Sequence, residues 1–381
     1  MGIAELTRNA VHVLPEDELE RKLALGRPLR VKLGIDVTSP DIHVGRAIPL
    51  QRMRAFQDEG HTGVLIIGDY TTRIGDPSGR STERPILDEE EIEANARTYL
   101  DQAMVVLDPD RTEVRRNGEW LSKLTYADVV RLARTMTVAR LLERDDFAKR
   151  YAAQEPISVS ELLYPLMQAY DSVAVEADVE LGGTDQLYNL LAGREVMQAY
   201  GLEPQVVLTT PLLLSWDGEK MSSSLGNNIP LTAPPEEMFG RTMRIPDELL
   251  ADWYRLVAER PVPGGEPMEA KLALARFIVA RSHGEEAARR AEEHFTRVVR
   301  ERHAPEEVPE WRLPGDDPVH LPRLLVAAGL ASSTSEARRL IAQGGVKLDR
   351  DVVEELDVPR GRLQGALLQA GKRRYLRLTP P

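Results

Sequence analysis

The stretch LRVKLGIDVTSPDIHVGRAIPLQRMRAFQDEGHTGVLIIG (residues 29–68) decides the fold of this chain. Its first seven residues, 29–35, predict a short strand. Residues 43–59 predict a helix with one apolar face, and Gly60 closes it as a C-terminal glycine. The apolar run 63–68 lies between turn residues and predicts a buried parallel strand. Strand, helix and strand at this spacing predict a doubly wound α/β sheet.

The pattern continues beyond this stretch with more helices and one further strand. The predicted helices are 88–100, 124–148, 158–176 and 184–200, and the predicted strand is 205–214. We place this α/β domain at residues 1–233. Residues 234–302 have a helical pattern and predict a separate helical domain. An acidic, Pro-rich linker over 303–318 is expected before a small last domain, 319–381.

Composition excludes several classes of protein. The 381 residues carry a formal charge of -12 and contain no cysteine, so disulfide scaffolds, thiolate metal sites and cysteine nucleophiles are excluded. The N-terminus lacks the apolar core of a signal peptide, and no apolar run approaches the roughly 18 residues of a membrane span. We expect a cytoplasmic protein without membrane contact.

The last domain differs from the rest in charge. Residues 319–381 hold 11 Lys and Arg against 6 Asp and Glu, a net charge of +5 that leaves -17 for the remainder. Arg338 and Arg339 form one basic cluster, and others lie at 360–362 and 372–377. A charge run alone more often means a solvated surface, but an acidic body with one basic domain also suits nucleic-acid binding.

Three segments carry residues suited to phosphate chemistry. In DVTSPDIHVGR (36–46), His43 and Gly45 fall at a helix start, where free N–H groups favour anions. In GDPSGRSTER (75–84), two arginines four residues apart could clamp a polyphosphate, although the glycine spacing is too short for a P-loop. In DGEKMSSSLGN (217–227), a lysine and three serines could close on a triphosphate. Each segment alone is weak evidence.

Taken in order, the three segments resemble a class I aminoacyl-tRNA synthetase. HVGR (43–46) is similar to the HxGH motif of that class, and KMSSS (220–224) to its KMSKS motif. YPLMQAYD (164–171) and ELGGTDQ (180–186) resemble the bacterial tyrosyl-tRNA synthetase family in particular. SEARRLIAQGGVKLD (335–349) resembles the RNA-binding domain of the ribosomal-protein S-four type. The resemblance implies a Rossmann-like catalytic domain, then a helical domain of the tRNA anticodon region, then a small α+β RNA-binding domain.

The resemblance also implies a role for single residues. The phenol of tyrosine would be held by Asp171. The other residues implied for amino-acid binding are Asp76, Tyr164, Gln168 and Gln186. Those implied for ATP binding are Asp36, His43, Gly45, Asp185, Lys220, Met221, Ser222, Ser223 and Ser224. Those implied for catalysis are His43, Arg46, Arg80, Arg84 and Lys220. Arg338, Arg339 and Lys347 would bind RNA.

The implied reaction joins L-tyrosine to tRNA(Tyr) with ATP, in a homodimer. Mg²⁺ would arrive on ATP, and we expect no metal site or prosthetic group of the protein itself. The chain departs from the family pattern at Lys32, Val37, Arg46 and Ser223. These departures leave three alternatives open: a paralogue that forms an aminoacyl-adenylate for another acceptor, a tryptophanyl-tRNA synthetase, and an inactive RNA-binding relative.

Overall fold

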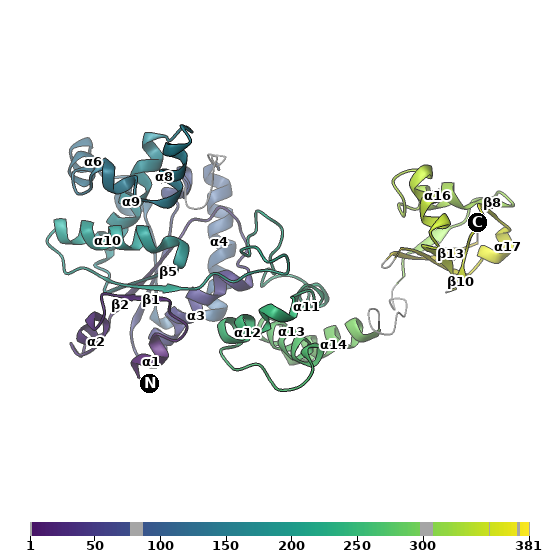
Figure 1. The fold of residues 1–381 in the computed structure, drawn as a ribbon, viewed down its shortest axis with the longest axis horizontal. Helices are drawn as coiled ribbons and strands as arrows, with labels where there is room; N and C mark the ends of the chain where they lie inside the picture. Colours follow the sequence, from purple (N-terminus) through teal and green to yellow (C-terminus); the bar gives the residue numbers. More distant parts are fainter. Residues whose placement is uncertain (1, 77–86, 298–307, 350, 372–373, 381) are drawn as a thin grey trace. The chain divides into compact units, whose positions relative to one another are not determined.

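The computed structural model describes residues 2–76, 87–297, 308–349, 351–371 and 374–380 (Figure 1). The chain divides into two compact units, Met1–Ala288 and Arg289–Pro381. Each unit is described by itself below.

A six-stranded sheet forms the centre of the first unit, in the order β1-β6-β5-β2-β3-β4. The strands from β2 to β6 are parallel to their neighbours, and β1 joins the edge in the antiparallel sense. The strands are β1 (His12–Leu14), β2 (Arg30–Ile35), β3 (Thr62–Ile67), β4 (Thr112–Arg116), β5 (Val179–Gly183) and β6 (Val206–Thr210). The chain builds outward from β2 through β3 to β4, and later returns to the other side of β2 with β5. The strand order therefore reverses between β2 and β5.

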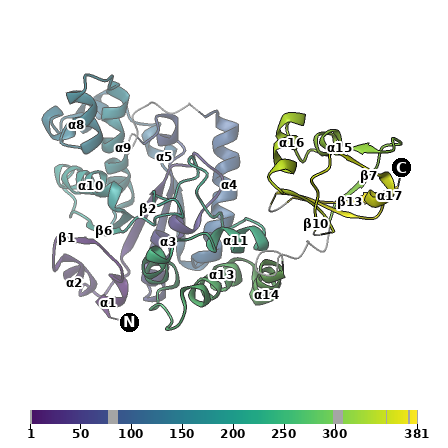
Figure 2. The ribbon, with the colours of Figure 1, turned by 45° about the vertical axis from the view of Figure 1, so that its right-hand side comes forward.

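Helices cover both faces of this sheet (Figures 1 and 2). The helices up to residue 295 are α1 (Ile3–Leu6), α2 (Glu18–Leu23), α3 (Val44–Asp58), α4 (Glu89–Val106), α5 (Gly118–Leu121), α6 (Tyr126–Ala133), α7 (Val138–Leu141), α8 (Asp145–Ala152), α9 (Val159–Val175), α10 (Leu187–Ala199), α11 (Pro235–Thr242), α12 (Leu250–Trp253), α13 (Pro267–His283) and α14 (Glu285–Phe295), and the last of them runs across the boundary between the two units. Short 3₁₀ turns occur at Thr71–Arg73, Pro109–Arg111, Thr184–Gln186 and Asp247–Leu249, and a π-helical turn at Tyr254–Ala258.

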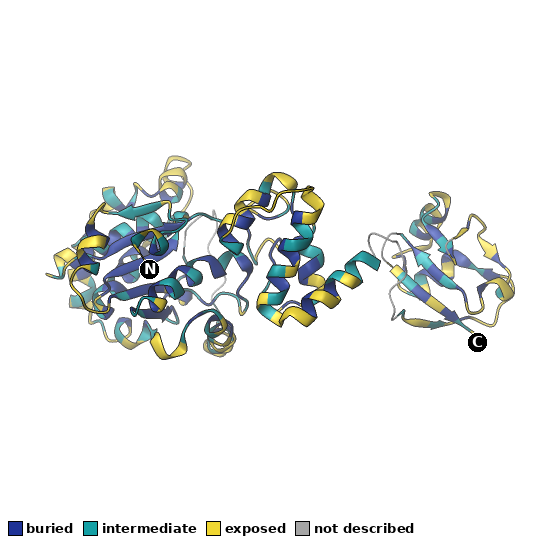
Figure 3. Ribbon diagram, turned by 90° about the horizontal axis from the view of Figure 1, so that it is seen from below, coloured by how far each residue is buried: buried dark blue, intermediate teal, exposed yellow. Residues whose placement is uncertain are grey.

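Alternation along β3 shows how the sheet separates two cores. Leu65 and Ile67 pack with residues of α3 and α4 on one face. Val64 and Ile66 pack on the opposite face with Val175, at the end of α9. Because side chains alternate along a strand, a continuous apolar run buries both faces, and Figure 3 shows these strands as buried. The predicted doubly wound α/β sheet is confirmed.

The second unit contains a five-stranded sheet in the order β10-β9-β12-β13-β7, and a two-stranded sheet of β8 and β11. The elements are β7 (Glu310–Arg312), β8 (Val319–His320), α15 (Leu321–Ala327), α16 (Thr334–Ala342), β9 (Val346–Leu348), β10 (Asp351–Val352), β11 (Asp357–Val358), α17 (Arg360–Leu363), β12 (Leu367–Ala370) and β13 (Arg374–Thr379). Its own core includes Leu325, Ile341 and Leu368, which gives the expected α+β domain a separate interior.

Several boundaries differ from the sequence-based expectations. The single helix expected over 124–148 is three helices, α6 to α8, because Thr125 and Thr137 each cap a new helix start. The strand expected to end at residue 214 ends at Thr210, since Pro211 follows and has no N–H to donate. Helices α11 to α13 belong to the first compact unit, although we predicted a separate helical domain from residue 234. Strand β7 lies inside the stretch predicted as a linker, 303–318.

Candidate active site

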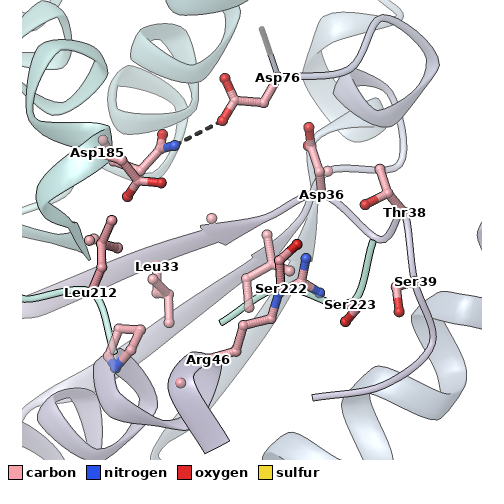
Figure 4. Close-up of a pocket in the computed structure, with 18 of the residues that line it drawn as sticks. Leu33, Asp36, Thr38, Ser39, Arg46, Asp76, Asp185, Leu212, Ser222 and Ser223 are labelled. Atoms are coloured by element: carbon pink, nitrogen blue, oxygen red, sulfur yellow. Dashed lines mark hydrogen bonds between the residues drawn. The ribbon is translucent and has the colours of Figure 1, made fainter. Parts of the chain in front are cut away.

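A cavity of about 1260 Å³ opens at the carboxyl edge of the first sheet (Figure 4). It lies where the strand order reverses, between β2, which ends at Ile35, and β5, which ends at Gly183. Open α/β sheets place ligands at this position, because the loops after the two strands diverge there and leave a crevice.

The structure brings most of the predicted site residues together around this cavity. The residues that line it are Asp36, His43, Gly45, Arg46, Asp76, Tyr164, Gln168, Asp171, Asp185, Gln186, Lys220, Met221, Ser222, Ser223 and Ser224. Arg80 and Arg84 fall outside the described residues. In the second unit, Arg338 and Arg339 are exposed on α16, and Lys347 is half-buried on β9.

Asp171, on α9, is a buried carboxylate that receives two side-chain hydrogen bonds. Trp120 Nε1 donates to its Oδ1 at 2.8 Å, and Asn117 Nδ2 donates to its Oδ2 at 3.3 Å. Burial raises the pKa of Asp171 to about 7, while the nearby positive charge of Lys32 and these two donors oppose the rise. A group of this kind can accept a hydrogen bond from a ligand and can change charge near neutral pH.

Lys32, whose charge acts on Asp171, is part of a buried ion pair. Its side chain is fully buried on β2, and Nζ lies 2.8 Å from Glu180 Oε1 on β5. Nζ also donates to Ser172 Oγ at 2.7 Å and to the carbonyl oxygen of Gln168 at 3.0 Å. The ammonium is therefore satisfied by the protein itself. It links β2 to β5 through Glu180 and places a positive charge near Asp171.

Tyr164 and Asp36 form a second polar group at the same edge. Tyr164 Oη donates to Asp36 Oδ2 at 2.9 Å, and Thr71 Oγ1 donates to Asp36 Oδ1 at 2.8 Å. The close approach depends on Gly68, because a Cβ there would lie 2.4 Å from both Asp36 Oδ1 and Thr71 Oγ1. Asp36, predicted for ATP, thus contacts a residue predicted for the amino acid.

The start of α3 places a neutral histidine and a cation at the cavity. His43 is the N-cap, and its Nδ1 accepts from the backbone N–H of Arg46 at 3.2 Å. Burial, together with the positive charges of Arg46 and Lys220, lowers the pKa of His43 to about 3, so the imidazole is neutral at physiological pH. Nη1 of Arg46 is buried and makes no hydrogen bond within the described part of the chain.

The segment that contains Lys220 is folded onto the site. The ammonium of Lys220 forms an ion pair with Asp185. Asn227 supports the segment, because its Oδ1 accepts from the N–H of Ser222 at 2.8 Å and its Nδ2 donates to the carbonyl oxygen of Lys220 at 3.2 Å. Ser223 Oγ accepts from Asn228 at 3.2 Å. The three serine hydroxyls therefore lie on a loop whose base is held by Asn227 and Asn228.

Some residues of the site were missed by sequence reasoning. Asn117 and Thr71 line the cavity, and Asn117 follows strand β4 at its carboxyl end. That strand reads TEVRR, without the apolar run that predicted its neighbour β3. The sequence therefore did not predict that Asn117 follows a strand at the edge where the site lies. The polar residues that support Asp76, described below, were missed for a similar reason.

Two negative findings apply to the described ranges only. Among them, no three His, Cys, Asp or Glu side chains come together in a way that could hold a metal ion. No helix in these ranges has the length and apolar character needed to cross a membrane.

Comparison with protein families gives a match to each unit. The model of class I tRNA synthetases for tryptophan and tyrosine matches residues 24–300, and the S4 domain model matches residues 320–357. Curated tyrosine–tRNA ligases are similar over nearly their whole length. That of Moorella thermoacetica is 50% identical over 98% of this chain and 94% of its own. That of Thermotoga maritima is 49% identical over 98% of this chain and 96% of its own.

This chain belongs to the class I tyrosyl-tRNA synthetase family. The family was predicted from four motifs in the first unit and one in the second, and the prediction is confirmed. The fold class, including the S4 domain, is confirmed as well. Among solved structures, tyrosyl-tRNA synthetase of Archaeoglobus fulgidus, complexed with L-tyrosine, aligns with a TM-score of 0.61 at 25% identity. The alignment covers 76% of this chain and 98% of the Archaeoglobus fulgidus chain.

Proposed function

We propose that this chain is a tyrosine–tRNA ligase. In the first step a carboxylate oxygen of L-tyrosine attacks the α-phosphorus of ATP, and pyrophosphate leaves. In the second step a hydroxyl of the 3′-terminal ribose of tRNA(Tyr) attacks the carbonyl carbon of the adenylate, and AMP leaves. The single observation that carries the proposal is the buried carboxylate of Asp171 in the lining of the cavity, in a chain whose curated relatives are named tyrosine–tRNA ligases.

Asp171 recognises the phenol in this proposal. Trp120 and Asn117 each donate one hydrogen bond to Asp171, which leaves further lone pairs of its two oxygens for the O–H of tyrosine. Phenylalanine would bury this polar group without giving it a donor, and an unpaired buried polar group costs about 1–3 kcal/mol or more. Tyr164, Gln168, Asp76 and Gln186 would surround the α-amino group.

The other end of the cavity binds ATP. His43 is neutral and offers a directed contact without charge. Lys220 and Arg46 supply positive charge for the phosphates, with Arg80 and Arg84 expected beside them. No nucleophile of the protein is needed, so catalysis comes from positioning and from stabilising charge in the transition state. Mg²⁺ enters with ATP and is held by its phosphates.

Binding of ATP would rearrange Lys220. Asp185, the residue proposed to bind the ribose of ATP, is now paired with Lys220. The ammonium must leave Asp185 before it can reach a phosphate. Half of the Lys220 side chain is exposed, 51% by area, so this movement breaks few other contacts.

The second unit would hold the tRNA. Arg338 and Arg339 lie on exposed turns of α16, and Lys347 lies on β9 of the same S4 domain. Their charges suit phosphate contacts, which give affinity and orientation more than sequence selection. We place the reaction in the cytoplasm, as predicted from the sequence.

We also propose that the chain forms a homodimer. Large apolar side chains are exposed between α6 and the start of α9, and we propose that they contribute to the dimer interface. They are Tyr126, Val130, Val138, Tyr151 and Val159, between 42% and 85% exposed. Sedimentation analysis should give twice the mass of one chain, and Val138→Asp with Val159→Asp should give a single chain.

The function is tested by ATP–pyrophosphate exchange with tyrosine, tryptophan and phenylalanine in turn, followed by transfer to tRNA. We expect exchange with tyrosine alone, followed by transfer. Exchange without transfer to any tRNA would identify a paralogue with another acceptor. Exchange with tryptophan alone would reverse the assigned specificity. No exchange with any of the three would leave the RNA-binding alternative.

A further inference from the structure

Helix α4 brings a tyrosine to the cavity. Tyr99 is 1% exposed, and it belongs both to the hydrophobic core and to the lining of the cavity. Its hydroxyl group forms no hydrogen bond within the described part of the chain, and the positive charge of Arg46 acts on it. A polar group that is kept almost out of water without a partner costs free energy of folding. The hydroxyl group of Tyr99 therefore indicates a contact with a ligand.

Two polar side chains on the same face of α4 fix the position of Tyr99. Asn95 precedes it by one turn and Gln102 follows it by one turn, so the three share one side of the helix. Asn95 Nδ2 donates to the carbonyl oxygen of Val37 at 3.0 Å, and Gln102 Oε1 accepts from the backbone N–H of Ile42 at 2.9 Å. Both bonds tie α4 to the segment between β2 and α3. Tyr99 has no partner in that segment, all of which is described, and its side chain lines the cavity instead.

Arg46, near Tyr99 at the start of α3, is also without a partner. Its guanidinium forms no ion pair or hydrogen bond with the described residues, and Nη1 is buried. A guanidinium has five N–H donors and no acceptor. Burial raises the pKa of Tyr99 and outweighs the opposing charge of Arg46, so the phenol keeps its proton and can donate it to an acceptor. Two neighbouring donors, one of them permanently charged, thus lack an acceptor.

A phosphate group suits these two donors. Its oxygens accept several hydrogen bonds and carry negative charge, whereas adenine and ribose carry none. Ser39 and Ser223 add hydroxyl groups to the lining of the same cavity (Figure 4). Lys220 lines the cavity too, but its ammonium is engaged by Asp185. Among the described residues, Arg46 therefore offers a positive charge to a phosphate without first giving up an ion pair.

We propose that Tyr99 binds ATP, donating a hydrogen bond from its hydroxyl group to an oxygen of the two terminal phosphates, which Arg46 also contacts. This proposal rests on the proposed function, in which the start of α3 lies at the ATP end of the cavity. Tyr99 and Arg46 hold the pyrophosphate portion of ATP in the ground state, and Lys220 acts on it as charge develops. Tyr99 contacts inorganic pyrophosphate in the same way when the reaction runs in reverse.

Tyr99→Phe in the full-length chain tests this contact, because it removes one oxygen and keeps the ring in the core. We expect the KM for ATP and the KM for pyrophosphate to rise about tenfold, as when a hydrogen bond to a charged group is lost. The KM for tyrosine and the Ki for AMP, which lacks the two terminal phosphates, should change less than about twofold. The kcat for exchange should change little. Pyrophosphate exchange with each compound varied in turn measures all of these constants.

Tyr254→Phe is the matched control. Tyr254 is fully buried away from the cavity lining, and its hydroxyl group donates to the carbonyl oxygen of Ala270 at 2.8 Å. Its loss leaves a buried acceptor unpaired, so the melting temperature should fall while the kinetic constants keep their parental values. Tyr99→Phe should show the reverse pattern, with weaker binding of ATP and pyrophosphate and a melting temperature that is unchanged or higher, since no protein partner is lost.

Unchanged KM values for ATP and pyrophosphate in Tyr99→Phe would overturn the proposal. A rise in the KM for tyrosine alone would overturn it as well, because the two donors would then hold the carboxylate of the amino acid. A lower melting temperature with all constants equally affected would make Tyr99 a structural residue only.

Absence of tyrosine-dependent exchange in the parent chain would instead overturn the proposed function. Calorimetric titration with magnesium pyrophosphate would still decide the role of Tyr99 in that case. We expect about tenfold weaker binding to Tyr99→Phe than to the parent chain, and equal binding to the two chains would contradict the contact.

Discussion

Single residues decide which amino acid this site can accept, and Asp171 should do so in a pH-dependent way. Its pKa is about 7, because burial outweighs the positive charge of Lys32 and the hydrogen bonds from Trp120 and Asn117, and Glu180 adds to the rise. The ionised carboxylate is the stronger acceptor for the phenol. We therefore expect the KM for tyrosine to fall about tenfold between pH 6 and pH 8 and to be level above that, measured by pyrophosphate exchange.

Asp171→Asn is the control for this profile, since it cannot ionise. Its KM for tyrosine should be high and independent of pH. The raised pKa of Asp171 also makes the stability of the fold depend on pH. The folded chain holds a proton on Asp171 that the unfolded chain has released, so this group's contribution to stability decreases as pH rises from about 4 to about 7. A parent KM that is flat from pH 6 to pH 8 would contradict the pKa of Asp171.

Lys220 should act on the rate more than on binding. In the proposed mechanism its ammonium reaches the phosphates only as charge develops on the departing pyrophosphate. Lys220→Ala should therefore lower kcat for exchange about 100- to 1000-fold, the usual effect of removing one such group, with a smaller change in the KM for ATP. Lys149→Ala is a suitable comparison, because this exposed lysine pairs with Asp145 on the surface. A similar loss of rate in both variants would contradict the assignment.

At the scale of the residue, sequence reasoning found the groups that belong to motifs and missed the groups that support them. Asp171, Lys220 and His43 were placed by motif, and they line one cavity. Arg144 and Asn189 were not found, because Arg144 donates hydrogen bonds to Asn189 and Asp76, which lie 45 and 68 residues away along the chain. Spacing along the chain cannot reveal such contacts.

Two glycines on neighbouring strands should respond in opposite ways to the same substitution. Gly34 of β2 lines the cavity, and a Cβ there would meet no protein atom within 4 Å. Gly63 of β3 faces α3, where a Cβ would lie 2.8 Å from Met53 Sδ and 2.9 Å from Gln57 Nε2. The methyl group of Gly34→Ala therefore enters space proposed for substrate, and that of Gly63→Ala enters a packed interior.

We expect Gly34→Ala to raise the KM for tyrosine or ATP at least threefold with an unchanged melting temperature. Gly63→Ala should lower the free energy of unfolding by about 1–3 kcal/mol, as overpacked cores do, with nearly normal kinetic constants. Thermal denaturation and exchange kinetics on the same preparations would measure both. A destabilised Gly34→Ala chain with parental kinetics would show that this part of the cavity takes no substrate.

At the scale of elements, strong periodicity was a reliable guide and short polar strands were not. The prediction for residues 43–59 agrees with α3, since the apolar face and the closing glycine are both visible in sequence. Strand β4 was missed, because three of its five residues are charged and none is buried, at the edge of the sheet. The break between α6 and α7 depends on Thr137, whose side chain accepts from the N–H of Arg140. A threonine inside a stretch with helical apolar periodicity cannot be recognised as a helix N-cap from the sequence.

At the scale of the whole molecule, the residues proposed for the chemistry and those predicted to bind tRNA lie in different compact units. All described residues proposed for amino-acid activation lie in Met1–Ala288, and the predicted RNA-binding residues lie in Arg289–Pro381. A chain that ends at residue 297 should keep pyrophosphate exchange within about threefold of the parent. Its charging of tRNA should fall at least tenfold and should lose much of its salt dependence, because fewer phosphate contacts remain. Normal charging by this shortened chain would contradict the assigned role of the S4 domain.

The pairing of Lys220 with Asp185 means that the nucleotide must displace an internal competitor. A substitution such as Asp185→Asn has two effects of opposite sign on ATP affinity: it weakens the proposed grip on the ribose, and it releases a cation that is otherwise sequestered. Because the two effects oppose each other, the KM for ATP would change only modestly, although each effect alone would change it more. A double-mutant cycle of Asp185 and Lys220 would separate them. The coupling energy between the two positions reports the ion pair that competes with ATP, and it does not include the contact between Asp185 and the ribose.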